Sequence, residues 1–531
     1  MFLELSFFNK KQLKYFLILL FLITQAGCFS KKKANKNNNI LVVNGFAEPE
    51  SFDWHLDGTG SEVVDALAEQ LIHIAVTSGK YKLKPGIVNK WSRNKKGDSW
   101  LINIRSDIKW SDGKPLETQH VLDSFIRLLN PKVGAKGVQQ LFNIKNAKNF
   151  FEGKINNFKE VGINQVGTNQ IRFTLDKPMS HFPYILTQAS LSPIRLDILK
   201  KFTSPDLFQK NLATLSPFTL MEHKPGEYSI LKRNPLYYGK PAETEKIKVL
   251  HLQSQITGVR LFETGKIHLQ IGLPAENLNF YKKLPTYRNE ETLALGYIAF
   301  NLRKKPMQNK WLRRAIAQAI DPNEVVKVLG GNKKAISLWM PRPLRSWDSL
   351  ELEKNYFNPK LAKKWLKKSG YDVHSKPNIT LLHHIYENHQ LMCENIQQQL
   401  KKNLGLNIEL NKMEWKFFLN QVRNDPPQIY RLGQSPSLPH ATAVLNMLST
   451  ELHSVNTGWN NPTFESLLQK ALLEKDKSKL DNYILEATKI IAEEAPVVPI
   501  YSGNNDALVS QKIKKIPSFN ITNLLAYLSF N

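Results

Sequence analysis

The sequence predicts a fold of the α/β or mixed class that is divided into two or three lobes. Three observations support this prediction. With 531 residues, the chain is too long for one simple core. Hydrophobic residues make up 42% of it and aromatic residues 10%, which suffices for large cores and excludes a disordered chain. From Ile40 onward, short apolar strands alternate with amphipathic helices.

The individual elements follow from the spacing of apolar residues, which differs between strands and helices. Strands are expected at Ile40–Val43, Leu101–Ile104, Ile379–Leu382 and Leu406–Leu410. Helices are expected at Val63–Val76, Lys310–Ile320, Lys360–Lys368, His389–Leu404, Phe464–Leu473 and Lys479–Ala495. No internal repeat interrupts this alternation.

The N-terminal segment has the pattern of a secretory signal. Three lysines precede the apolar run Tyr15–Ile23, which is too short to span a bilayer. Ala26 and Gly27 follow, and then Cys28. This junction resembles the lipobox of bacterial lipoproteins, although Gln25 stands where that pattern usually has leucine. We therefore expect lipidation of Cys28, with an ordinary signal peptide and a chance cysteine as the alternative. Residues 28–39 are polar and basic and are expected to form a flexible tether.

The net charge and the cysteine content exclude few functions. The formal net charge of +27 favours anionic partners, but a solvated basic surface accounts for it equally well. The chain has only two cysteines, so acylation of Cys28 would leave no internal disulfide. Cys393 lies in an apolar helical stretch and is expected to be packed.

Motifs for catalysis or phosphate binding are missing from the sequence. It contains no G-x-x-x-x-G-K-[ST], G-x-S-x-G, H-E-x-x-H or paired C-x-x-C. The adjacent histidines His383 and His384 would point to opposite faces of a strand. Together with His389 they would therefore not converge readily on one metal ion. We expect no enzyme, no cofactor and no metal site. Export and the lack of a recognition motif also argue against a nucleic-acid binder.

Several segments, taken in order, carry a more specific signal. They are Ala47–Asp53 (AEPESFD), Lys109–Pro115 (KWSDGKP), Asp123–Arg127, Ser216–Phe218, Arg233–Tyr238, Phe300–Asn301, Leu312–Asp321, Asn403–Asn407 and Ala495–Tyr501. Together they resemble the periplasmic oligopeptide-binding proteins, solute-binding family 5, over roughly residues 44–502. Within these segments, Trp110 is expected to fill a core, and Ser111–Pro115 to form a turn that Gly113 permits.

The resemblance implies a periplasmic binding protein type II-like fold, with two main lobes, a hinge, an extra domain and mixed sheets. It divides the mature chain into domain I (residues 40–59, 186–290 and 499–531), domain II (60–185) and domain III (291–498). The ligand would be enclosed when the lobes close on it. Residues 1–27 precede this arrangement as the signal peptide.

The resemblance also implies a set of ligand-binding residues. Peptide-binding members hold the ligand backbone as an added strand, here along Arg431, Leu432, Gly433 and Gln434. His389, Trp415 and Tyr297 match a family histidine and two pocket aromatic residues. Ser437 stands where the family aspartate binds the peptide ammonium group, so Glu48 is a candidate for the missing counter-charge. Enclosing an ammonium without a carboxylate is costly, which predicts altered recognition of the peptide N-terminus.

The function implied by the resemblance is capture of oligopeptides or peptide-like ligands for an ABC importer. The partners would be the ligand, ABC permease subunits and the membrane reached through the anchor on Cys28. The protein would be a periplasmic, lipid-anchored monomer of the cell envelope. The alternative is a binding protein of the same fold for a non-peptide ligand, such as a glycopeptide fragment, a metal chelate or haem.

Overall fold

The computed structural model describes residues 40–45, 48–57, 61–77, 80–274, 277–330, 333–347, 356–372, 375–452, 454–516, 518 and 524–530. The chain divides into two compact units, Met1–Ile40 and Leu41–Asn531. The signal peptide, the tether and Cys28 that the sequence predicts lie outside the described residues, as does Ala47. The second unit contains the elements discussed below.

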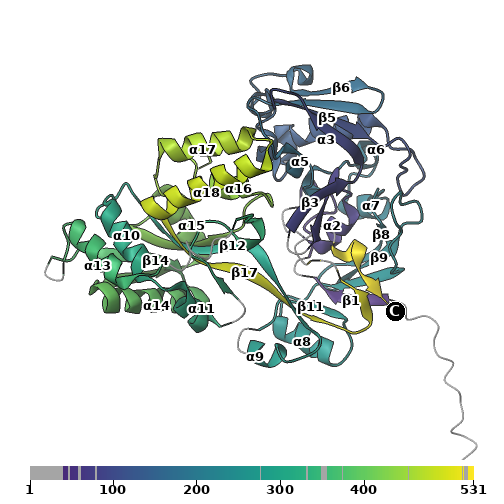
Figure 1. The fold of residues 1–531 in the computed structure, drawn as a ribbon. Coiled ribbons are helices and arrows are strands. Elements are labelled where there is room, and N and C mark those ends of the chain that lie inside the picture. The colour runs from purple at the N-terminus through teal and green to yellow at the C-terminus, as the bar shows by residue number, and fades with distance from the viewer. Residues whose placement is uncertain are drawn as a thin grey trace, which may run out of the picture. The chain divides into compact units, whose positions relative to one another are not determined.

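An 11-stranded mixed sheet forms the framework of this unit (Figure 1). Its path runs through β15 (Ile408–Met413), β14 (Ile379–His384), β16 (Ile429–Gln434), β12 (Tyr287–Phe300), β17 (Val497–Val509), β11 (Leu269–Ile271), β1 (Ile40–Asn44), β10 (Lys246–Leu250), β9 (Tyr228–Arg233) and β8 (Phe218–Lys224). A short strand, β13 (Lys334–Ala335), pairs with β17 outside this path. Strand β14 runs parallel to β15 and β16, and β1 runs parallel to β11.

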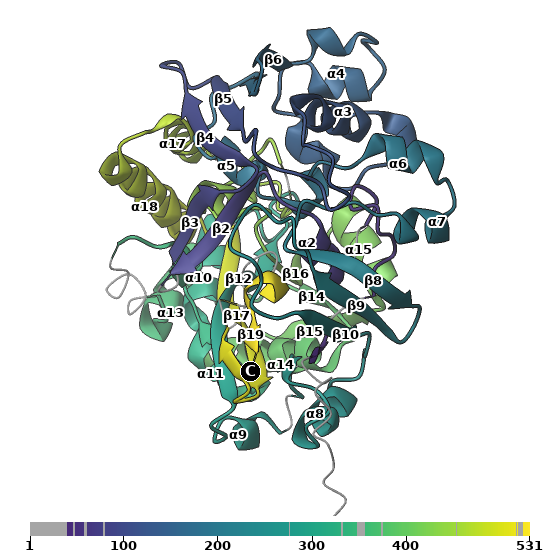
Figure 2. The same ribbon diagram turned by 90° about the vertical axis from the view of Figure 1, so that its right-hand side faces the viewer.

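Smaller sheets carry the segment between β1 and β8 (Figure 2). Four antiparallel strands lie in the order β4 (Val88–Arg93), β5 (Ser99–Ile104), β7 (Gln170–Thr174) and β6 (Ile163–Gly167). The same segment contains the pair β2 (Ile72–Thr77) and β3 (Lys80–Pro85), whereas the pair β18 (Ile513–Lys515) and β19 (Ser529–Phe530) lies near the C-terminus. The fold is therefore of the α/β class with mixed sheets, as the sequence predicted.

Helices fill the connections between the strands. The α-helices are α2 (Glu62–Leu67), α3 (Thr118–Leu128), α4 (Ala147–Phe151), α5 (Phe182–Ile185), α6 (Leu196–Lys201), α7 (Pro205–Lys210), α8 (Gln255–Glu263), α9 (Leu278–Tyr281), α10 (Lys310–Ala319), α11 (Pro322–Leu329), α13 (Pro359–Lys368), α14 (Glu387–Leu404), α15 (Trp415–Asn424), α16 (Ala441–Asn446), α17 (Pro462–Leu473) and α18 (Lys477–Glu494). Short 3₁₀ turns are η1 (Pro131–Val133), η2 (Val138–Leu141), η3 (Phe158–Glu160), η4 (Ala189–Leu191), η5 (Arg342–Leu344) and η6 (Leu524–Tyr527). Within the part of the chain that the structure describes, no helix has the length and apolar character needed to cross a membrane.

Local sequence signals explain where several helices begin. The Asn461 side chain accepts hydrogen bonds from the backbone amides of Thr463 and Phe464, and Pro462 occupies the first turn of α17. Asn309 accepts from the amides at the start of α10 in the same way. The predicted helices that correspond to α10, α13, α14, α17 and α18 are confirmed, with ends that differ by at most two residues. The strands predicted at β1, β5 and β14 are also confirmed, and β15 begins two residues later than predicted.

The predicted helix Val63–Val76 is wrong in its second half. Helix α2 ends at Leu67, and Ala68 already has extended backbone angles. Residues 72–77 form β2 instead, which pairs along its whole length with β3. Four of these six residues are β-branched and favour a pleated strand, namely Ile72, Ile74, Val76 and Thr77. Pairing with β3 therefore prevails over the helical spacing of the apolar residues.

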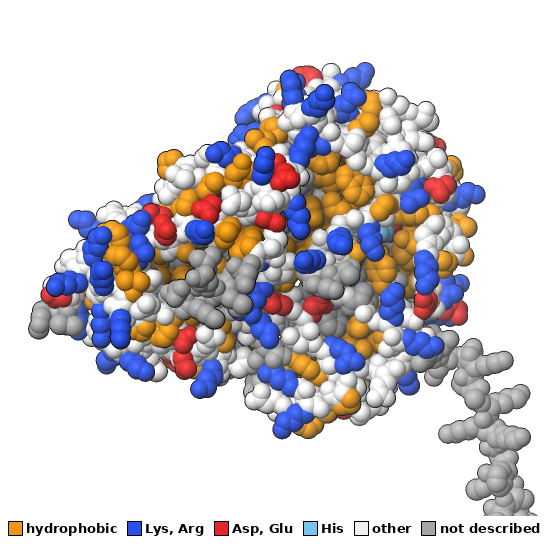
Figure 3. Space-filling view, in the orientation of Figure 1, with side chains coloured by type: hydrophobic (Ala, Val, Ile, Leu, Met, Phe, Trp, Pro, Cys, Tyr) orange, Lys and Arg blue, Asp and Glu red, His pale blue; other side chains and the backbone are white. Residues whose placement is uncertain are grey.

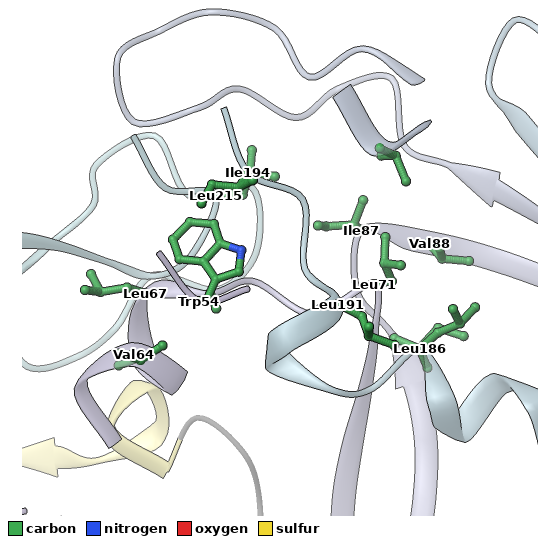
Figure 4. Packing of buried hydrophobic residues seen from close by; sticks show 14 of the residues in the cluster. Trp54, Val64, Leu67, Leu71, Ile87, Val88, Leu186, Leu191, Ile194 and Leu215 are labelled. Carbon is green, nitrogen blue, oxygen red and sulfur yellow. The ribbon is translucent and has the colours of Figure 1, made fainter. Parts of the chain in front are cut away.

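Separate groups of buried apolar side chains stabilise the two ends of the sheet. One group surrounds Trp54, which packs among residues such as Leu67, Leu191 and Leu215 (Figure 4) and donates from Nε1 to the Ser192 carbonyl at 3.0 Å. Two other groups cover the opposite faces of the β12–β16–β14 region, with Ile298 on one face and Leu432 on the other. These cores hold the strands that carry the candidate site.

Two smaller predictions about packing are confirmed. Trp110 is fully buried, and Gly113 has a φ of +89° in the turn, where Asp112 accepts a hydrogen bond from the Lys114 amide. Cys393 has no exposed surface, and burial raises the pKa of its thiol to about 12. Both features belong to the scaffold.

Candidate functional site

The connectivity of three parallel strands points to a crevice. The chain runs from β14 through α14 to β15, and then through α15 to β16, but the spatial order is β15–β14–β16. The first connection therefore runs from β14 to β15, and the second runs back past β14 to β16, so the two run in opposite directions along the sheet. In open α/β sheets, such a reversal leaves a crevice beyond the carboxyl ends of the strands, and ligands bind there. The side chains at the ends of β14 and β16 consequently define the candidate site.

Strand β16 presents an edge without a strand partner in this crevice. Its parallel pairing with β14 covers only Ile429 and Tyr430. From Arg431 to Gln434 the strand pairs with β12 on its other side, where the partners are Leu295–Ile298. Gly433 is exposed. Among the described residues, no strand adjoins Arg431–Gln434 on the β14 side, so an extended ligand backbone could pair there.

Arg431 carries a buried positive charge at the start of this edge. Its side chain is 6% exposed, and one guanidinium nitrogen donates a hydrogen bond of 2.5 Å to the Tyr501 hydroxyl. The Nε atom is buried and has no hydrogen-bond partner in the described part of the chain. No carboxylate of the described residues forms an ion pair with this guanidinium. A buried cation without an anion is costly, so the group is suited to a ligand carboxylate.

Gly296 makes room for the contact between Arg431 and Tyr501, whereas a Cβ atom at Gly433 would be in ordinary contact with the guanidinium. Gly433 lies opposite Gly296 on β12, which lies opposite Tyr501 on β17. A Cβ atom at Gly296 would lie 2.2 Å from Cζ of the tyrosine ring. The guanidinium nitrogens of Arg431 lie 3.6 and 3.7 Å from the equivalent position at Gly433. The tyrosine ring therefore lies directly over β12, where any larger residue would displace it.

His389 adds a second ligand group at the start of α14. Burial is the largest cause that lowers its pKa to about 3, and the charge of Arg431 acts in the same direction. Its Nδ1 atom is buried and has no hydrogen-bond partner among the residues that the structure describes. The rings of Tyr386 and His384 lie 5.3 and 5.6 Å from its ring. The imidazole is thus neutral beside Arg431 and can donate to, or accept from, a ligand.

Trp415 joins this group through His384. The two rings are 5.2 Å apart, and Trp415 also stacks on Phe418 at 5.7 Å. Trp415 is the first residue of α15 and lies beside the end of β14, and 42% of its surface is exposed. Large apolar side chains around it are exposed as well, namely Ile385, Tyr386 and Phe417. An apolar wall therefore flanks the cationic groups, which suits a ligand with apolar side chains.

Tyr297 and Leu432 lie on the opposite face of the sheet from Arg431. The two are paired across β12 and β16, and successive strand residues point to opposite faces. Tyr297 is fully buried, with its ring 4.8 Å from that of Trp339. Its hydroxyl is buried without a partner. In this structure Tyr297 belongs to the core beneath the site and has no surface that a ligand could reach.

Ser437 and Glu48 occupy separate places. Ser437 is exposed in the loop after β16, and its carbonyl accepts a hydrogen bond from Gln188 Nε2 at 3.4 Å. Glu48 contacts the turn between β8 and β9, where its carboxylate accepts from the Gly226 amide at 2.7 Å. Strand β9 is six positions from β16 in the sheet order. The structure therefore does not bring Glu48 together with Arg431 and His389.

Three residues near Arg431 were not predicted as site residues. Tyr501 and His384 make the contacts described above. Lys333 lies 5.7 Å from the Tyr501 ring centroid, and its pKa is lowered by burial and by Arg431 against the opposing effect of Asp506. Lys333 precedes β13, and the pairing of that strand with Tyr501 brings the lysine to the site. Nothing in the local sequence marks it, because the pairing joins segments that are far apart in the chain.

Other hollows in the structure lack comparable groups. One of about 640 Å³ lies over β4 and β5, lined by Asn89, Trp91 and Leu101 among others. Another, of about 720 Å³, lies beside α3 and α6 and includes Arg127, which is already paired with Asp53. Basic side chains are scattered over the visible face and do not form one stripe (Figure 3). The unpaired charge and the free strand edge therefore favour the crevice at β16.

Known proteins match this chain over most of its length. The model of the family described as bacterial extracellular solute-binding proteins, family 5 Middle, matches residues 82–456. The dipeptide-binding protein DppE of Bacillus subtilis is 24% identical over 92% of this chain and 93% of its own. The periplasmic murein peptide-binding protein MppA of Escherichia coli is 26% identical over 86% of each chain.

Solved structures show the same fold. The unliganded open form of the murein tripeptide-binding protein MppA superposes with a TM-score of 0.82 at 23% identity, covering 92% of this chain and 96% of that one. A complex of Haemophilus influenzae OppA with the peptide RPPGFSPFR gives a TM-score of 0.70 at 22% identity, covering 93% and 99%. The periplasmic binding protein type II-like fold is thereby confirmed.

Proposed function

Because the chain belongs to the bacterial extracellular solute-binding proteins of family 5, which are not enzymes, we propose that it captures peptides or peptide-like ligands for an ABC importer. The observation that carries this proposal is the buried guanidinium of Arg431, which has no carboxylate partner among the described residues and lies beside the free edge of β16. A ligand with a carboxylate and an extended backbone matches both features. Relatives whose names specify dipeptides and murein peptides support the same ligand class.

Binding would begin with the ligand carboxylate at Arg431. The guanidinium would donate to it while keeping its bond to Tyr501, and the neutral His389 imidazole would provide one further hydrogen bond. Lys333 adds positive potential nearby. Charge-assisted hydrogen bonds in a site with little water are the strong ones, so this end of the ligand would fix its position.

The ligand backbone would then run along Arg431–Gln434 as an added strand. Pairing with backbone groups is indifferent to the ligand side chains, which accounts for capture of varied peptides. The side chains on one face would contact the apolar wall of Trp415, Tyr386 and Phe417. Leu432 and Tyr297, on the opposite face of the sheet, would support the strand from the core.

The site would not recognise the other end of the ligand as it would an ordinary peptide N-terminus. Ser437 can accept one hydrogen bond but cannot neutralise an ammonium group, and Glu48 is engaged at β8–β9. We therefore propose a ligand that lacks a free α-amine. A peptide whose N-terminus is acylated has that chemistry.

Transport would require further features of the family. The proposed lobes are residues 40–59 with 186–290 and 499–531, residues 60–185, and residues 291–498, and they would close on the ligand. A lipid on Cys28 would hold a monomer in the periplasm at the membrane, and ABC permease subunits would take up the ligand. These features rest on the signal sequence and on family membership.

The test is mass spectrometry of small molecules that co-purify with the full chain. The expected result is a set of carboxylate-bearing peptide derivatives without a free α-amine, released on denaturation in amounts close to one per chain. A mixture of peptides with free amino ends would keep the peptide function but refute the proposed reading of Ser437. A ligand without peptide bonds would overturn the peptide proposal.

A further inference from the structure

A second group of potential ligand atoms lies far along the sheet from Arg431. Glu48, His223 and His251 each place one nitrogen or oxygen atom within 4.8 Å of the others. Glu48 lies in the connection between β1 and α2, His223 lies on β8, and His251 directly follows β10. Three segments that are distant in the sequence therefore converge on one point, which is why the sequence gives no sign of this group.

The distance between the Glu48 carboxylate and the His223 imidazole fits an ion pair and also fits two ligands of one metal ion. The Glu48 Oε1 atom lies 3.7 Å from His223 Nε2, too far for a hydrogen bond. Two atoms that each lie about 2.0–2.1 Å from a tetrahedral Zn²⁺ are separated by about 3.4 Å. A cation could thus bridge the two side chains after a movement of a few tenths of an ångström. The His223 side chain is 8% exposed and that of Glu48 is 36% exposed, so the position is partly screened from solvent.

Ser229 orients both imidazole rings from outside the group. Its hydroxyl lies 2.9 Å from His223 Nδ1 and 3.0 Å from His251 Nε2. Each ring then has one nitrogen left: Nε2 of His223 faces Glu48, and Nδ1 of His251 is buried without a hydrogen-bond partner among the described residues. With both rings donating to it, the serine oxygen would fix the tautomers that leave those two nitrogens free for a metal.

The surrounding backbone holds the three ligands in place. The Glu48 carboxylate accepts from the Gly226 amide at 2.7 Å, and the His251 amide donates to the Glu227 carbonyl at 3.0 Å. The Phe52 ring packs edge-on against His223 with centroids 4.9 Å apart. Ligating carboxylates are commonly hydrogen-bonded in this way, so the Gly226 contact is compatible with a bound cation.

We propose that Glu48, His223 and His251 form a binding site for a divalent transition-metal cation of the Zn²⁺ class, oriented by Ser229. Two imidazoles and one carboxylate are a known zinc ligand set, and imidazole nitrogens disfavour Ca²⁺ and Mg²⁺. Three protein ligands leave a fourth position for water. The bound cation would tie the connection after β1 to the β8–β9 hairpin and so stabilise the folded chain. This site is independent of the proposed peptide function.

Zinc titration of the full chain tests the proposal. The protein carries no polyhistidine tag, is stripped with EDTA and is titrated with ZnCl₂ in a calorimeter, and Co²⁺ serves as a spectroscopic probe of coordination. We expect one Zn²⁺ per chain, visible-region absorption of the Co²⁺ form that indicates four- or five-fold coordination, and a melting temperature that zinc raises and EDTA lowers. Absence of stoichiometric binding would overturn the proposal.

Variants locate the site on the chain. His223→Asn and His251→Asn should abolish stoichiometric binding, the isosteric Glu48→Gln should weaken it, and Ser229→Ala should weaken it about 10–100-fold. His120→Asn, on α3, is the matched control and should bind Zn²⁺ like the unchanged protein. Each variant must melt at the temperature of the metal-free protein, which shows that it is folded. Unchanged zinc affinity in both the His223 and His251 variants would place the metal elsewhere and refute the site.

Discussion

Arg431 on β16 and Tyr501 on β17 meet across the intervening strand β12, and a hydrogen bond of 2.5 Å joins the guanidinium to the tyrosine hydroxyl. The contact depends on Gly296 between them, because a side chain there would occupy the place of the tyrosine ring. The bond fixes the orientation of a charge that has no ion-pair partner among the described residues. The candidate site is therefore built by the central strands of the sheet as well as by its loops.

Replacing Gly296 with alanine should displace the Tyr501 ring, since the new Cβ would lie 2.2 Å from it. We expect the affinity for a carboxylate ligand such as N-acetyl-trialanine to fall about tenfold, with a loss of folding stability of about 1–3 kcal/mol from the crowding. Gly167→Ala is the control, because its Cβ would be 3.5 Å from the nearest atom and its φ is not positive. Calorimetric titration measures the affinity of both variants for this ligand. If Gly296→Ala binds it as tightly as Gly167→Ala does, the role given to Gly296 is contradicted.

Arg431→Met should separate ligand binding from stability. Loss of the guanidinium should weaken binding of N-acetyl-trialanine by about 2–5 kcal/mol, but not that of its C-terminal amide. The free energy of unfolding should stay the same or rise, because the variant removes an uncompensated buried charge. Titration calorimetry and urea unfolding measure the two quantities.

A second arginine provides the contrast for this experiment. Arg313 is 2% exposed and donates at 2.8 Å to each of the carbonyls of Met307 and Glu494. Arg313→Met would leave buried carbonyl groups without donors and should therefore lower stability without changing the selectivity for a ligand carboxylate. If Arg431→Met destabilises the chain as Arg313→Met does, Arg431 is structural.

Much of the fold follows from local sequence. The periodicity of apolar residues was sufficient to predict α10, α13, α14, α17 and α18. It was not sufficient at residues 68–77, where apolar residues fit a helical period as well as a strand and pairing with β3 decides the outcome. Such a choice is made by tertiary contacts, which no window of sequence contains.

The site is less accessible from sequence than the fold is. Arg431, His389 and Trp415 come from three different elements, and only their order along a known family marks them. Lys333 and Tyr501 join them through the pairing of β13 with β17, which has no local signal. The placement of Tyr297 also depends on pairing, because the register of β12 with β16 puts it opposite Leu432 and therefore on the other face from Arg431.

Ser437→Asp should create recognition of a free peptide N-terminus. The new carboxylate would neutralise an ammonium group that the serine cannot, so we expect the affinity for trialanine to rise about tenfold relative to its N-acetyl form. Ser435→Asp adds the same charge at another exposed position of the loop and should not change this ratio. If trialanine binds to Ser437→Asp no better than to the unchanged protein, the argument about the missing aspartate fails.

His181 and His440 link acid conditions to stability. Their rings stack at 5.3 Å between α5 and α16, and Thr442 Oγ1 lies within hydrogen-bond distance of both. Burial lowers the pKa of His181 to about 3 and that of His440 to about 4, whereas the pKa of an unfolded histidine is about 6.5. Below pH 6.5 the unfolded chain therefore binds protons that the folded chain does not. Their contribution to stability is complete above pH 6.5 and is lost as the pH falls toward 4 and then 3.

His440→Asn tests this linkage, because asparagine preserves the N-terminal cap that His440 gives to α16. The free energy of unfolding should fall less steeply with acid in the variant, by about 1.4 kcal/mol per pH unit below pH 6.5. Urea unfolding at pH 7.5 and pH 5.0, at constant ionic strength, measures the difference. Parallel losses of stability in the two proteins would mean that His440 is already protonated in the folded chain, and that burial does not control its titration.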